Sequence, residues 1–126
     1  MAAVIVLRPV EGVGLDPARL AALYRELGPV ETDSLLTRAV GEMVLQVSAL
    51  VAHYENSDFP AFSRGLRGLA RMADHVGFTV LSRAAGAVAA CTTTGDATAL
   101  AATWERLLRL AVDALDGGTD LRGLSR

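Results

Sequence analysis

Residues 58–95 read DFPAFSRGLRGLARMADHVGFTVLSRAAGAVAACTTTG, and this stretch carries two apolar patterns with the spacing of a helix face. The first pattern comprises Phe59, Phe62, Leu66, Leu69, Ala70 and Met72. The second comprises Phe78, Val80, Leu81, Ala84, Val88 and Cys91. Gly77 separates the two patterns, and residues 92–95 follow the second, so each ends at residues that stop helices. We therefore predict two consecutive helices that face a shared core.

Helical patterns also precede and follow this stretch. Asp16 suits the cap of a short helix that Gly28-Pro29 ends. Residues 32–34 are expected to open a longer helix, whose apolar stripe comprises Leu36, Val40, Met43, Val44, Val47, Leu50, Val51 and Tyr54. Asp96 or Thr98 is expected to cap a last helix, whose inward residues are Leu100, Trp104, Leu107, Leu108, Ala111 and Leu115.

The connections between these helices are short, which forces neighbouring helices to run antiparallel. The expected fold is therefore all-α, an up-down-up-down four-helix bundle with a short N-terminal lead-in helix. We assign residues 15–115 to this bundle, residues 1–14 to an extended N-terminal arm and residues 116–126 to a loose C-terminal tail.

Composition narrows the classes of function. The chain has 126 residues, enough for one domain, and its formal net charge of −2 gives no general attraction to nucleic acid or to anionic membranes. The lone cysteine, Cys91, excludes an internal disulfide and is read as a packed thiol in a reducing compartment. The N-terminal MAAVIVLRPV is too short for a signal peptide, and no unbroken apolar run approaches the length of a membrane span. We expect a cytoplasmic protein.

Four landmarks in the sequence carry a family resemblance: Ser57-Asp58, Gly77, Leu81 and Gly95-Asp96. In them the chain resembles the histidine phosphotransfer (HPt) domain of bacterial phosphorelays. The resemblance implies a partner, the receiver domain of a response regulator or a histidine kinase. A receiver presents a cluster of acidic side chains around a magnesium ion and exchanges a phosphoryl group with a histidine exposed on the bundle.

The resemblance places Arg67 at the position of that histidine. Ala70 stands where the family has a lysine, and Arg71 stands where it has a glycine that leaves room for the receiver. Arginine stays protonated and is not a nucleophile. We therefore expect the fold of the HPt family without its phosphotransfer activity. Aligning Leu66-Arg67-Gly68 with the family's Leu-Lys-Gly would move the histidine position to Arg64, but then the spacing to Gly77 no longer fits.

The sequence therefore predicts a pseudo-phosphotransfer domain of two-component signalling, which binds its partner without carrying phosphate and is not an enzyme. The predicted partner-binding residues are Arg64, Arg67, Ala70 and Arg71. The three arginines are spaced to share one helix face, where an acidic partner surface would meet them. A solvated basic stripe without a partner is the alternative reading of the same spacing. No cofactor is expected.

Two further readings stay open. His75 is the weak candidate for a displaced phosphoacceptor, and His53 is a weaker one; a helix-end or surface role explains either. Alternatively the bundle is a structural module, and a second copy of the chain binds through the strand-like segment VIVL, residues 4–7. Two distant histidines and one cysteine do not make a metal site, and none is predicted.

Overall fold

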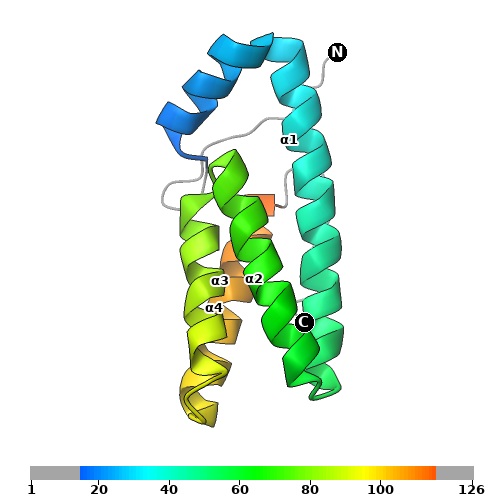
Figure 1. Cartoon of the computed structure of the whole chain (residues 1–126), viewed down its shortest axis with the longest axis vertical. Coiled ribbons are helices and arrows are strands. Elements are labelled where there is room, and N and C mark those ends of the chain that lie inside the picture. The colour runs from blue at the N-terminus through cyan, green and yellow to red at the C-terminus, as the bar shows by residue number, and fades with distance from the viewer. Residues whose placement is uncertain (1–14, 116–126) are drawn as a thin grey trace.

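The computed structural model describes residues 15–115, and within them the chain forms four helices and no strand (Figure 1). The helices are α1 (Pro17–Glu55), α2 (Phe59–Val76), α3 (Thr79–Cys91) and α4 (Ala97–Leu115). Consecutive helices pack against each other, whereas α1 and α4 share far fewer contacts. The prediction of an all-helical bundle is confirmed. The expected arm, residues 1–14, and the expected tail, residues 116–126, lie outside the described residues.

The helices begin and end at residues that the sequence singled out. Asp16 and Asp58 accept hydrogen bonds from the first turns of α1 and α2, at Ala18 N and Ala61 N. Gly77 ends α2 in the left-handed conformation, with φ of 96°, which a glycine adopts without strain. Between the alternatives for α4, Asp96 is the residue whose carboxylate accepts a hydrogen bond, from Ala99 N at 3.0 Å.

α1 contains the predicted break between a short helix and a longer one, because it consists of two helical segments joined by a kink at Gly28. Gly28, with φ of 82°, interrupts the helical backbone, and Pro29 suits the restart because the first turn needs no donor from its nitrogen. The helix therefore resumes before Thr32 rather than at it. Thr32 is buried, and its hydroxyl donates to the Leu23 carbonyl at 3.0 Å. This bond fixes the angle between residues 17–27, called the lead-in segment below, and the rest of α1.

The lead-in segment is anchored at the C-terminal end of α2. Asp16 N donates to the Gly77 carbonyl at 2.8 Å. Arg19 donates from Nε and Nη2 to the carbonyl of His75, at 3.1 and 2.8 Å. A Cβ on Gly77 would lie 2.8 Å from Arg19 Cγ, so a glycine is needed for this approach as well as for its backbone angle.

The core runs along the inner faces of all four helices. The largest fully buried side chains are Phe62, Phe78, Leu36, Met43, Leu50, Leu66, Leu69, Leu81, Leu107, Leu115 and Val47. At the end of the bundle near the α1–α2 turn, Trp104 is buried, with its ring centroid 5.4 Å from that of Tyr54 and 5.1 Å from that of Phe62. Phe59, expected to face inward, is 40% exposed because it is the first residue of α2, at the open end of the bundle.

The outward side of α1 is an exception, because large apolar side chains are exposed there. Leu45 is 70% exposed and Val30 is 74% exposed. Among the described residues, α1 is also the one helix with the length and apolar composition of a membrane-crossing segment, a test that core helices of soluble proteins also pass.

Candidate functional site

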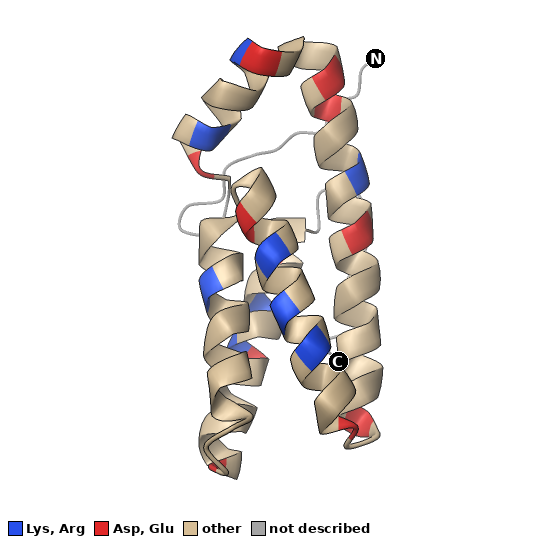
Figure 2. Cartoon of the chain, viewed as in Figure 1, with Lys and Arg blue, Asp and Glu red and all other residues tan. Residues whose placement is uncertain are grey.

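Three arginines project from the outer side of α2, and we call Arg64, Arg67 and Arg71 the arginine face. All three are exposed, as the sequence predicts. Figure 2 shows three basic positions following one another along α2. Their spacing of three and four residues places them within about two turns, roughly 10 Å along the helix axis.

The burial of the opposite side of α2 sets this orientation. Phe62, Leu66 and Leu69 are each fully buried in the core. A rotation of α2 that buried an arginine would expose these side chains, and each buried side chain of this size contributes about 1.5–3 kcal/mol. The arginine face therefore points outward because the inner face holds the helix in place.

Hydrogen bonds from both neighbouring helices fix the flanks of α2. Gln46 on α1 donates from Nε2 to the Gly65 carbonyl at 3.1 Å, and Ser82 on α3 donates from Oγ to the Ala70 carbonyl at 2.9 Å. A Cβ on Gly65 would lie 2.8 Å from Leu50 Cδ2, which shows how closely α1 approaches α2. These contacts tie the backbone of α2, which carries the arginines, to both neighbouring helices.

Arg67, at the position that the resemblance gives to the histidine, bonds within its own helix. Its Nη1 donates to Ser63 Oγ at 2.9 Å. A guanidinium has five N–H donors, so this single bond leaves donors for a partner. Ala70, also predicted to bind the partner, is half-buried and packs against the core. Its methyl group therefore borders the arginine face on the α3 side rather than standing out from it.

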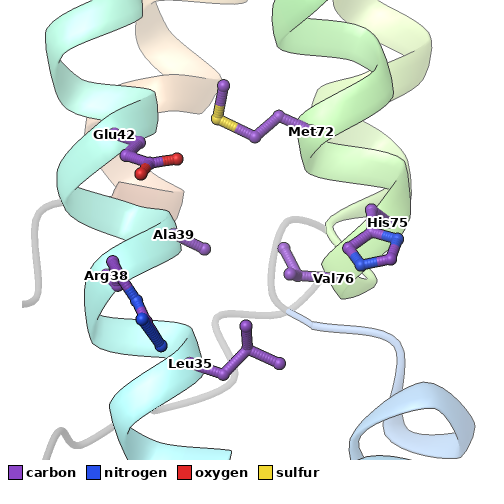
Figure 3. A pocket seen from close by; sticks show the side chains of 7 residues that line it. All are labelled: Leu35, Arg38, Ala39, Glu42, Met72, His75 and Val76. Carbon is purple, nitrogen blue, oxygen red and sulfur yellow. The ribbon is translucent and has the colours of Figure 1, made fainter.

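His75 lies one turn after Arg71, near the C-terminal end of α2, on the flank of that helix that meets α1. It is exposed and lines an open hollow of about 140 Å³ with Leu35, Arg38, Ala39, Glu42, Met72 and Val76 (Figure 3). His53 is half-buried in the last turn of α1, at the opposite end of the long part of that helix. The structure thus brings His75, but not His53, near the arginine face.

The other side chains that could bind a metal ion or act as a nucleophile do not cluster within the described residues. Residues 15–115 hold no group of three or more histidine, cysteine or acidic side chains able to bind a metal ion. Cys91 is half-buried rather than packed within the core, because it is the last residue of α3.

Sequence reasoning missed the residues that support the site. Gln46 and Ser82 act through side-chain bonds to carbonyls of α2, and neither stands out in an apolar pattern. The glycine at position 65 carried a usable signal, because a glycine inside a helix often marks the close approach of a neighbour.

The comparisons with known proteins give no relative: the chain matches no protein-family model, no curated protein and no solved structure.

Proposed function

We propose that this chain is a degenerate HPt-like domain of two-component signalling. In this proposal the bundle has up-down-up-down topology, and the arginine face binds a receiver domain or a histidine kinase in the cytoplasm without carrying phosphate. The observation that carries the proposal is the exposure of Arg64, Arg67 and Arg71 together on the outer side of α2. Short turns between helices and the packing of consecutive helices support the topology.

The chemistry of the face suits binding better than transfer. A guanidinium remains cationic and forms paired hydrogen bonds to a carboxylate or phosphate, but it supplies no nucleophilic nitrogen. The acidic pocket that a receiver presents has the matching charge. Binding at such a face is expected to weaken as salt rises, because exposed charges are screened within about 8–10 Å at physiological ionic strength.

The shape of the face also supports docking. Gly68 lies between Arg64 and Arg71 in the sequence and has no side chain, and a Cβ there would meet only Gln46 Nε2, at 3.7 Å. No side chain therefore protrudes from position 68 between Arg64 and Arg71, and a loop of the partner has room to approach the backbone of α2. An HPt domain uses a glycine for the same purpose at the position that Arg71 occupies here.

The test is a binding and phosphotransfer measurement with phosphorylated receivers and histidine kinases from the source organism. We expect binding without label on this chain, and we expect Arg67→Glu to weaken binding by about tenfold or more, which corresponds to 1.4 kcal/mol. Arg106→Glu is the matched control, because Arg106 is exposed on α4, away from this face. Equal loss in both variants would indicate a general charge effect and would contradict the proposal.

An active phosphotransfer protein that uses His75 is the second candidate. The exposure of this imidazole beside a hollow favours it. Its signature is a label that survives base, is lost in acid and disappears in His75→Ala. Absence of that label in every kinase and receiver mixture rejects this candidate and leaves the binding proposal intact.

A further inference from the structure

The side of α1 that points away from the core presents mostly small or apolar residues, with charged residues along one edge. We call it the outer face of α1, and its exposed residues are Val30, Ser34, Thr37, Gly41, Leu45 and Ala52. They recur at the three- and four-residue spacing of one helix face, over roughly 33 Å at 1.5 Å per residue. α4 covers little of α1.

Two features of the outer face suit contact with another helix. Leu45 is 70% exposed, which leaves a large apolar side chain in water near the middle of the face. Gly41, one turn before it, is exposed, and a Cβ built there meets nothing within 4 Å. The space at Gly41 can receive a side chain of a second helix, and the protruding Leu45 can enter a space on that helix, as in the packing of ridges into grooves.

The charges along one edge of the outer face of α1 indicate which partner binds there. Arg38 and Glu42 are both exposed and lie four residues apart, on the side of α1 that borders the hollow with α2 (Figure 3). When two copies of α1 pack antiparallel about a two-fold axis, a residue that precedes the crossing point in one copy lies opposite the residue that follows it by the same number of positions in the other copy. A crossing near residue 40 therefore places Arg38 against Glu42 of a second copy, and the reverse pair forms at the same time.

We propose that the outer face of α1 is a self-association surface, on which a second copy of this chain packs its own α1 antiparallel, crossing near residue 40, next to Gly41. This contact is distinct from the arginine face, and it differs from the expected contact through VIVL. The pairing covers Leu45 in both copies, and it places Arg38 of each copy opposite Glu42 of the other. Stable interfaces bury about 1,200 Å² or more, and one helix face lies at the low end, so the dimer is expected to dissociate on dilution.

A bilayer fits the same face less well. Hydrocarbon would surround Arg38 and Glu42 and leave both charges without a partner from another chain. A second copy turns the same two charges into complementary pairs. The reciprocal spacing therefore favours a protein partner, and among protein partners it favours an identical helix.

Sedimentation velocity of the full chain over a wide concentration range tests the proposal. We expect a monomer–dimer equilibrium, and we expect Gly41→Arg to raise the dissociation constant by about tenfold or more, because a long charged side chain prevents close approach. Gly86→Arg is the matched control: Gly86 is exposed on α3, and its Cβ position is equally open. Circular dichroism checks that both variants remain helical.

A charge exchange tests the antiparallel arrangement itself. Arg38→Glu and Glu42→Arg should each weaken the dimer by placing like charges together, and the double variant should restore it. A monomer at every concentration overturns the proposal. So does a dimer that all these variants leave unchanged, which would point to residues 1–14 instead. Sedimentation with phosphatidylcholine vesicles, without self-association, overturns it in favour of a membrane.

Discussion

α1 and α2 lie side by side and both bury one apolar side, yet their outer sides differ in composition. α2 buries Phe62, Leu66 and Leu69 and turns three arginines to solvent. The long part of α1 also buries one side, with Met43 and Leu50 fully covered, but its outer side presents Leu45 and other apolar or small residues. The difference shows that the large apolar side chains of α2 are mostly covered within a single copy of the chain, whereas α1 leaves large apolar side chains exposed on its outer side.

Two leucines give the largest expected contrast between these helices. Leu66→Ala opens a cavity in the core and should lower the free energy of unfolding by about 2–5 kcal/mol. Leu45→Ala removes an exposed side chain and should change it by less than about 0.5 kcal/mol in dilute, monomeric protein. Urea unfolding followed by the fluorescence of Trp104, the one tryptophan, measures both. A loss at Leu45 as large as at Leu66 would show that the outer face is covered within one copy.

Two glycines give a smaller contrast, of opposite sign. Gly65→Ala places a Cβ 2.8 Å from Leu50 Cδ2 and should lower the free energy of unfolding by about 1–3 kcal/mol. Gly41→Ala meets nothing within 4 Å and should raise it by about 0.5–1 kcal/mol, because alanine favours the helix. The same urea titration measures both variants. If Gly65→Ala were as stabilising as Gly41→Ala, α1 and α2 would not approach as closely as the structure indicates.

The local features of the fold were predictable because the residues that cause them are adjacent in the sequence. Gly77 ends α2, as its position after an apolar pattern predicts. Asp58, which precedes that pattern, accepts a hydrogen bond from Ala61 N and so caps the helix. The exposure of the arginine face followed from the same periodicity, because residues opposite a buried stripe face solvent.

Features that depend on a neighbouring helix could not be predicted in this way. The sequence predicts a helix start at residues 32–34, but the break at Gly28, with its positive φ of 82°, lets the helix restart earlier. The Thr32 hydroxyl instead donates a hydrogen bond to the Leu23 carbonyl. Val44 and Val51 belong to a regular stripe yet are only half-buried, because α4 covers little of α1. Periodicity shows which side of a helix points inward, but not how completely the next helix covers it.

The anchoring of the lead-in segment implies an order of assembly. The bonds from Arg19 to the His75 carbonyl join residues 56 positions apart, whereas short turns connect α2, α3 and α4. Closing so long a loop costs chain entropy before any contact repays it. The lead-in segment is therefore expected to dock after the end of α2 has formed and to open first under mild denaturant. Its backbone amides should exchange with deuterium sooner than those of α2, while the rest of the bundle remains folded.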